Sequence, residues 1–276
     1  MAYYKPEQIM DITIGSGQKK TSYSLMQTMI LGFQAGAFIS LGFLLYIRVT
    51  APLAGPLEGL SSLIGAAVFP IGLILTLLAG GELLTGNMMA VPLAGLARKV
   101  SGWQVMKNWS LITLSNFLGA IFVAYVFGHL TGLTESGIYL EKTISIAEHK
   151  IEATFLEAFL SGIGCNWLVA LAVWLSYGSE DMGGKILGIW FPTMAFVAIG
   201  FQHVVANMFV IPAAIFAGSF TWIEYFHNFV PVFLGNAAGG TLFVAMAYWY
   251  SYNKKTSPQK QKHVSLVKNS SGVSVK

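Results

Sequence analysis

A short passage occurs twice in this chain, 120 residues apart. The first copy, NMMAVP, begins at Asn87, and the second copy, NMFVIP, begins at Asn207. Another asparagine follows each copy after 29 residues, opening NFLGA at Asn116 and NAAGG at Asn236. Because self-similarity at a fixed offset is the signature of a repeated structural unit, the sequence predicts a protein made of two related halves.

Both halves consist of long apolar stretches, which sets the class of protein. Hydrophobic residues make up 55% of the chain, charged residues make up 10%, and the mean hydropathy is +0.64. Soluble domains carry about 25% charged residues. About 20 apolar residues cross a hydrocarbon core roughly 30 Å thick. Six segments reach this length, so we predict an all-α integral membrane protein with spans near 24–49, 60–96, 105–130, 151–177, 186–217 and 229–252.

Because each half contains three spans, an odd number, the second half enters the membrane with the opposite polarity from the first. We predict two inverted three-helix repeats, at residues 24–130 and 151–252, within a transmembrane domain of residues 23–252. Inverted repeats place their functional site near the bilayer midplane, where broken helices meet. Glycine and proline predict such breaks in the second span, at 79–92, and in the fifth, at 198–212. The half-helices that follow would present free N–H groups, which favour anions.

The ends of the chain and its charges indicate an orientation. Residues 1–22 are predicted to form a short interfacial helix, and residues 253–276, rich in lysine, a disordered basic tail. With both termini in the cytoplasm, the basic residues left outside are Arg48, Lys142 and Lys150. This asymmetry agrees with the positive-inside rule. The bilayer therefore accounts for the net charge of +4, and no nucleic-acid partner is expected.

Polar side chains inside both predicted breaks favour a transport pathway, because such groups are costly at membrane depth. The first break contains Glu82 and Thr85, and the second contains Gln202 and His203. An imidazole with a pKa of about 6.5 exchanges protons near neutral pH, so His203 is the candidate proton carrier. Glu82 is predicted to brace its loop as an acceptor. The alternative is that glycine and proline merely kink packed helices and that His203 is a structural donor.

Three motifs resemble the signatures of the formate/nitrite transporters, a family that includes formate, nitrite and hydrosulfide channels of prokaryotes. They are AGGELLTGN at 79–87, GCNWLVALAVW at 164–174 and FVAIGFQHVVANMFVIP at 196–212. The resemblance implies an aquaporin-like protomer with its own pore, assembled as a homopentamer in a prokaryotic cell membrane. It also implies that the N-terminal segment gates the inner mouth at low pH.

The resemblance further implies roles for individual residues. The central polar site comprises Thr85, Asn166, Gln202 and His203. The apolar constriction comprises Phe69, Leu73 and Phe196, with Leu83 and Leu84 in the first loop beside it. Lys150 attracts anions at the outer vestibule. Two positions depart from the family pattern: Gln202 replaces a glutamate that many relatives carry, and Leu84 stands where formate channels often have phenylalanine.

Passage of a small monovalent anion is the predicted function, with formate ahead of nitrite and hydrosulfide. Moving a bare anion through an apolar ring costs several kcal/mol even after relaxation, whereas protonating an acid of pKa about 4 at pH 7 costs roughly 4 kcal/mol. We therefore expect a channel, or proton-coupled passage of the neutral acid, assisted by His203. The alternative is an aquaporin-like conduit for water, glycerol or ammonia.

A membrane enzyme or a non-transporting subunit is the third class. The sequence presents no nucleophile–base pair, metal cluster or phosphate-binding loop. Its single cysteine, Cys165, lacks companions for a thiolate metal site. No catalysis, metal or cofactor is expected.

Overall fold

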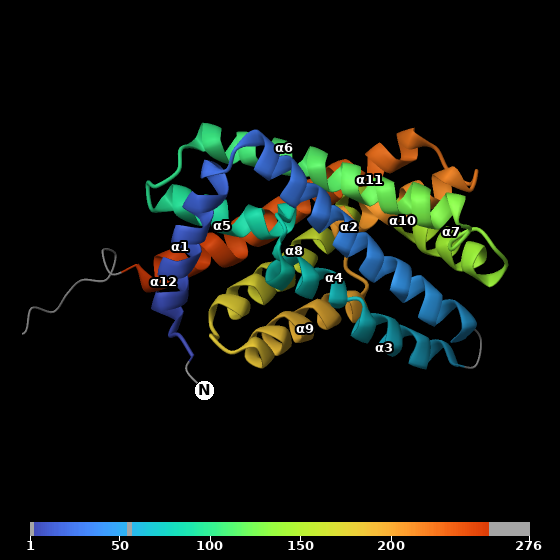
Figure 1. The fold of residues 1–276 in the computed structure, drawn as a ribbon, viewed down its shortest axis with the longest axis horizontal. Helices are drawn as coiled ribbons and strands as arrows, with labels where there is room; N and C mark the ends of the chain where they lie inside the picture. The colour runs from blue at the N-terminus through green and yellow to red at the C-terminus, as the bar shows by residue number, and fades with distance from the viewer. Residues whose placement is uncertain (1–2, 54–56, 254–276) are drawn as a thin grey trace, which may run out of the picture.

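The computed structural model describes residues 3–53 and 57–253, and these form a bundle of helices (Figure 1). Of the predicted tail, 253–276, all but Asn253 lies outside the described residues. In chain order the elements are α1 (Pro6–Ser22), α2 (Leu25–Thr50), η1 (Ala51–Leu53), α3 (Glu58–Val68), α4 (Ile71–Ile74), η3 (Leu75–Gly80), α5 (Leu84–Leu96), α6 (Gly102–Phe122), η4 (Val123–Leu130), α7 (Ile138–Ile151), α8 (Phe155–Tyr177), α9 (Met182–Ile199), α10 (Val204–Phe216), α11 (Trp222–Gly240), η5 (Thr241–Met246) and α12 (Ala247–Tyr252).

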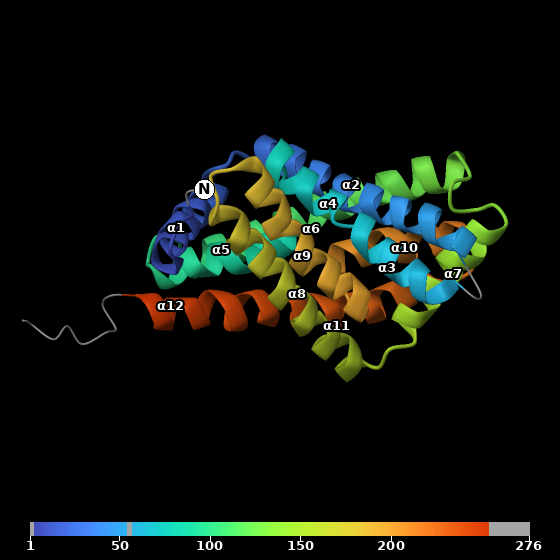
Figure 2. The ribbon, with the colours of Figure 1, turned by 90° about the horizontal axis from the view of Figure 1, so that it is seen from below.

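Six helices in the described part of the chain are long and apolar enough to cross a membrane, which confirms the predicted number. They are Leu25–Leu53, Gly59–Gly80, Gly102–Leu130, Phe155–Tyr177, Met182–Ile199 and Trp222–Tyr252. Two shorter apolar helices, α5 and α10, follow the second and fifth of these spans. Figure 2 shows the spans side by side, with α12 ending the long sixth span.

The predicted breaks in the second and fifth helices are also confirmed. The second span stops at the end of η3 and the chain resumes as α5, while the fifth stops at the end of α9 and resumes as α10. Gly80 and Gly200 occupy the breaks with φ angles of 109° and 88°. Glycine enters this region without a steric cost. The breaks lead the chain into the buried centre, where Met88 of α5 and Met208 of α10 are fully enclosed.

Glycines allow the paired spans to approach closely at equivalent points of the two halves. A Cβ at Gly119 of α6 would overlap the carbonyl of Phe33 in α2, and a Cβ at Gly239 of α11 would overlap the carbonyl of Ile163 in α8. Small residues at such crossings are the usual means of close helix packing in membranes. The 120-residue offset between the two glycines therefore reflects two equivalent helix pairs.

Two further helices, α1 and α7, extend the repeat beyond the expected bounds of 24–130 and 151–252. α1 packs on α5 at one end of the molecule and α7 packs on α10 at the other (Figure 1). α1 is more than a surface helix: Ile9 and Met10 are each 5% exposed, and a Cβ at Gly17 would overlap the carbonyl of Ala90 in α5. Each half therefore starts with a helix that covers the half-helix after its break, α5 or α10.

Candidate functional site

A single asparagine holds the first break in place. Asn116 accepts the N–H of Leu84 through Oδ1 at 2.9 Å. Its Nδ2 donates to the carbonyls of Gly32 at 2.8 Å and Glu82 at 2.9 Å. The side chain thus satisfies two backbone groups of the break and ties the break to α2 through the carbonyl of Gly32. Such groups each cost several kcal/mol in lipid if they stay unsatisfied.

Asn236 repeats this arrangement at the second break. It accepts the N–H of Val204 at 2.9 Å and donates to the carbonyls of Gly162 at 2.8 Å and Gln202 at 3.0 Å. The matching bonds explain the repeated spacing in the sequence. An asparagine 29 residues beyond each NM motif is needed because the third helix of each half braces the break.

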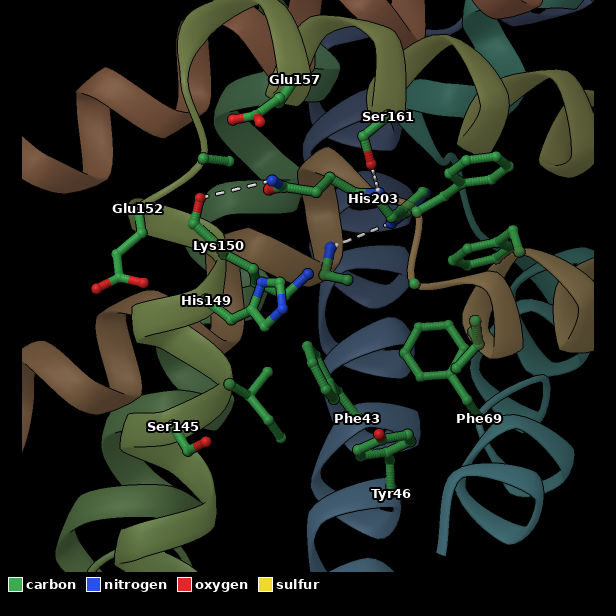
Figure 3. Close-up of a pocket in the computed structure, with 18 of the residues that line it drawn as sticks. Phe43, Tyr46, Phe69, Ser145, His149, Lys150, Glu152, Glu157, Ser161 and His203 are labelled. Atoms are coloured by element: carbon green, nitrogen blue, oxygen red, sulfur yellow. Dashed lines mark hydrogen bonds between the residues drawn. The ribbon is translucent and has the colours of Figure 1, made fainter. Parts of the chain in front are cut away.

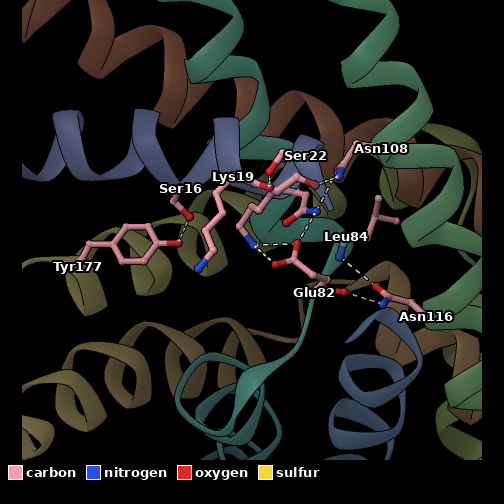
Figure 4. Close-up of polar contacts among 10 residues, drawn as sticks. Ser16, Lys19, Ser22, Glu82, Leu84, Asn108, Asn116 and Tyr177 are labelled. Atoms are coloured by element: carbon pink, nitrogen blue, oxygen red, sulfur yellow. Dashed lines mark hydrogen bonds and ion pairs between the residues drawn. The ribbon is translucent and has the colours of Figure 1, made fainter. Parts of the chain in front are cut away.

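A buried polar cluster joins α1 to the first break (Figure 4). Asn87 Nδ2 donates to Glu82 Oε2 and to Asn108 Oδ1, each at 3.0 Å. Asn108 donates in turn to the carbonyl of Lys20 at 3.2 Å, and the Lys20 ammonium lies 2.9 Å from both oxygens of Glu82. The prediction that Glu82 braces its loop as an acceptor is therefore confirmed, and its charge is balanced by Lys20.

The second break contains the same cluster with one chemical change. Asn207 donates to Gln202 Oε1 at 2.9 Å and to Asn228 Oδ1 at 2.8 Å. Asn228 donates to the carbonyl of Lys150 at 2.7 Å, so Lys150 occupies the position that Lys20 has in the first half. Gln202 stands where the first half has a carboxylate. Among the side chains that the structure describes, those of residues 3–53, 57 and 59–253, the Lys150 ammonium makes no ion pair.

The two breaks meet at a hydrogen bond between Thr85 and His203. Thr85 Oγ1 lies 2.9 Å from His203 Nε2, and both residues are buried. His203 Nδ1 accepts the N–H of Ala206 at 3.1 Å and so caps α10. A neutral imidazole has one acceptor and one donor nitrogen. The proton therefore lies on Nε2, which donates to Thr85.

Asn166 of α8 is hydrogen-bonded to the first half-helix, α5, and to α11. Its Nδ2 donates to the carbonyl of Thr85 at 3.2 Å and to the carbonyl of Asn236 at 2.7 Å. Its Oδ1 is buried and finds no hydrogen-bond partner among the residues described. Asn166 thus lies beside the Thr85–His203 contact, where it fixes the backbone of the first pore half-helix.

Aromatic rings pack in a row that leads to His203. The rings of Phe196 and His203 lie 5.8 Å apart between centroids, Phe69 meets Phe196 edge to face at 5.8 Å, and Phe43 meets Phe69 at 5.6 Å. Phe43 was not predicted, because in the sequence nothing distinguishes it from the other apolar residues of α2. The other predicted constriction residues are enclosed in the same hydrophobic core: Leu73, Leu83 and Leu84.

A cavity of about 650 Å³ opens on the α7 side of these rings (Figure 3). Five predicted site residues line it: Phe69, Lys150, Phe196, Gln202 and His203. The charged and titratable residues around Lys150 that also line it are Lys142, His149, Glu152 and Glu157. The Lys150 ammonium lies 5.9 Å from the centroid of the Phe43 ring. Burial lowers the pKa of Lys150 to about 8, against a smaller opposing effect of Cys165.

A smaller cavity of about 270 Å³ lies at the α1 side. Its lining includes the ion pair of Lys20 and Glu82, together with Lys19, Tyr23 and Lys185. The Ser16 and Tyr177 hydroxyls, 2.9 Å apart, join α1 to α8 at its edge. The larger cavity reaches His203, and the smaller one, at the opposite end of the molecule, reaches Glu82 in the first break.

Comparison with known proteins identifies this arrangement. The family model for the formate/nitrite transporters matches residues 7–250. The chain belongs to this family. It is 58% identical over 261 residues to the uncharacterized transporter YrhG of Bacillus subtilis (strain 168), with 95% of this chain and 98% of YrhG covered. It is 56% identical over 260 residues to the formate channel BtFdhC of Bacillus thuringiensis, with 94% and 100% covered.

A solved structure of a family member has the same fold. The pentameric formate channel with formate bound superposes with a TM-score of 0.74 at 30% sequence identity, and the match covers 83% of this chain and 98% of that one. As a formate/nitrite transporter, the chain is a multi-pass membrane protein built on the two inverted repeats described above.

Proposed function

We propose that each protomer is a transmembrane pore for formate, within a homopentamer in the plasma membrane of a prokaryote. The contact of Thr85 with His203, placed between two cavities, is the observation that carries this proposal. Formate as the substrate is supported by the 56% identity to BtFdhC and by the formate-bound relative. The pentamer is supported by the assembly that the relative's description states.

The orientation follows from charge. Placing α1 on the cytoplasmic side puts Lys19, Lys20 and Lys185 inside, and it puts the cavity of Lys142 and Lys150 outside. This distribution agrees with the positive-inside rule. Both termini are then cytoplasmic, and the α7 cavity is the outer vestibule.

Lys150 performs the first step, which is collection of the anion. Its ammonium is partly buried beside Phe43 and has no carboxylate partner in the described residues. In this setting an anion in the cavity meets an uncompensated positive charge, and the attraction between unit charges about 4 Å apart is about 4 kcal/mol at an effective dielectric of 20. The vestibule therefore concentrates formate ahead of the rings.

The second step is passage between the rings of Phe69 and Phe196, which favours a neutral species. A bare carboxylate that enters an apolar ring loses its hydration, whereas neutral formic acid passes at a cost of roughly 4 kcal/mol for protonation at pH 7. Because His203 Nδ1 is occupied by the N–H of Ala206, the ring does not take up a second proton without losing its cap bond. The proton is a hydronium proton of the outer solution, which formic acid carries across, and His203 offers its Nε2–H to a substrate oxygen.

The test compares substrates in liposomes containing the purified protein. We expect influx of formate to exceed that of nitrite, hydrosulfide and glycerol, and His203→Phe to abolish it. The matched control is His227→Phe, because His227 is exposed on α11 and the same chemical change is made away from the pore. Full formate influx in His203→Phe, or influx of glycerol alone in the unaltered protein, would overturn the proposal.

A further inference from the structure

The inverted repeat allows one end of the pore to be compared with the other. Lys20 and Lys150 are equivalent, since their carbonyls accept hydrogen bonds from Asn108 at 3.2 Å and from Asn228 at 2.7 Å. Both lysines lie on the helix that covers a pore half-helix, and each lines a cavity. The two ends therefore present the same cation in the same framework.

The residue facing each lysine differs between the ends. At the α1 end, Glu82 is 5% exposed and pairs with the Lys20 ammonium at 2.9 Å through both oxygens. At the α7 end, Gln202 is 6% exposed, and its Oε1 accepts from Asn207 and Asn228 as a carboxylate would. Gln202 carries no charge, so the Lys150 cation has no built-in counterion at this position.

The other acidic groups of the α7 cavity leave Lys150 without a partner. Glu157 is engaged in capping α8, where its Oε2 accepts the N–H and the hydroxyl of Thr154 at 2.9 and 2.7 Å. Glu152 is exposed and makes no ion pair with Lys150 in the described structure. Lys142 and His149 also line the cavity, and Lys142 adds a second positive charge.

We propose that Gln202 makes the α7 cavity a standing binding site for one small monovalent carboxylate, while Glu82 closes the equivalent site at the α1 end. The pore thus binds its anion asymmetrically, with formate serving as the counterion of Lys150. This inference rests on the proposed function for the identity of the anion. One position in each repeat decides whether its lysine is free to bind an anion: Glu82 at the α1 end and Gln202 at the α7 end.

The repeat also supplies the variants for a test. Gln202→Glu places a carboxylate in a framework that already holds one in the other half, so the change is compatible with the fold. Glu82→Gln makes the opposite change at the α1 end and leaves Lys20 unpaired. Lys20→Met combined with Glu82→Gln removes the cation as well, and so isolates the effect of the unpaired charge.

The measurement is the rise in unfolding temperature that sodium formate causes in the detergent-solubilised protein, with sodium gluconate at equal ionic strength as the reference. A ligand that binds only the folded state stabilises it by RT ln(1 + c/Kd), where c is the free ligand concentration, so at a fixed formate concentration tighter binding gives a larger rise. We expect Gln202→Glu to weaken formate binding about tenfold or more, because the carboxylate competes for Lys150. We expect Glu82→Gln to show a larger formate-dependent rise, and the double variant to lose that gain.

The outcomes separate this inference from the proposed function. A formate-dependent rise that Gln202→Glu retains in full would overturn the inference, as would a Glu82→Gln protein that gains no response to formate. If Gln202→Glu does not fold, the Glu82→Gln pair of variants decides alone. Formate binding without formate transport would contradict the proposed function and leave the inference standing, because the temperature rise does not depend on flux.

Discussion

Asparagine side chains replace, at each break, the hydrogen bonds that the helices give up. Asn116 and Asn236 each serve three backbone groups, and both are fully buried. An asparagine is suited to this task because its amide offers an acceptor oxygen and two donor hydrogens on a short side chain. The geometry of both breaks therefore depends on two buried asparagines.

Removal of either asparagine should destabilise the protein. We expect Asn236→Ala to lower the free energy of unfolding by about 2–5 kcal/mol, because each orphaned buried group costs about 1–3 kcal/mol. Asn116→Ala should have a similar effect, since the bonds are equivalent. Thermal unfolding in detergent measures both, with Ser251→Ala as the control because Ser251 is exposed. Unfolding temperatures for Asn236→Ala that match the control would contradict this role.

Lys150 should give anion uptake a pH dependence of its own. Its pKa is lowered to about 8 by burial, so the cation is present below this pH and is lost as the pH rises through it. We expect the apparent KM for formate to increase between about pH 7 and about pH 9 as the ammonium deprotonates. Lys142, His149, Glu152 and Glu157 also line this cavity.

Lys150→Arg provides the control for this pH dependence, because a guanidinium stays charged throughout. Its KM should stay level over the same range, and that of Lys150→Met should be high and level. Initial rates of formate exchange at each pH give the values. An increase in KM that persists in Lys150→Arg would assign the titration to another group.

Some residues of the site could be predicted from the sequence and others could not. His203 and Thr85 were predicted from their cost at membrane depth, and the structure brings them together at 2.9 Å. The hydrogen on Nε2 was not predictable, because it depends on the Ala206 N–H that only the folded cap presents. Phe43 and the Lys20–Glu82 pair were also missed, since their significance arises from partners distant in sequence.

At the scale of elements, the close packing of α1 on α5 depends on one glycine. Gly17 faces the carbonyl of Ala90, and a Cβ there would overlap it, whereas nothing lies within 4 Å of a Cβ at Gly15. The contact positions Lys20 against Glu82 and so links α1 to the first break. A change at Gly17 therefore disturbs both the packing and the ion pair.

The two glycines of α1 form a matched pair of variants. We expect Gly17→Ala to lower the free energy of unfolding by about 1–3 kcal/mol through overpacking. Gly15→Ala should be neutral or stabilising by up to about 1 kcal/mol, because alanine is the better helix former. Thermal unfolding of both proteins checks this. Equal stability of the two variants would show that α1 does not pack on α5 as described.

Some helices could be predicted from the sequence more clearly than others. The six spans and both breaks were predicted correctly because apolar length and glycine or proline within it are local signals. The membership of α1 and α7 in the repeat was not predicted. Lys20 and Lys150 are 130 residues apart, whereas Asn87 and Asn207 are 120 apart, so no single offset aligns the whole of each half. Polar residues in both helices also lower their apolar signal.

At the scale of the whole molecule, the proposed pentamer has a direct test. Six spans expose large apolar side chains in the isolated chain, among them Phe191, Leu187 and Ile199 of α9, and lipid or a neighbouring protomer would cover them. We expect native mass spectrometry of the detergent-solubilised protein to give five times the mass of the 29.8 kDa chain. A monomer as the sole species under conditions that keep the protein folded would contradict the assembly.

The central claim is that formate crosses the rings of Phe69 and Phe196 as the neutral acid. The most direct test is formate uptake into liposomes that contain the protein and an internal pH dye, without any ionophore to compensate charge. The account predicts that uptake acidifies the lumen, is faster at low external pH, and is lost in His203→Phe but not in His227→Phe. Uptake that leaves internal pH unchanged and requires a charge-compensating ionophore would show that the bare anion passes, and would contradict the account.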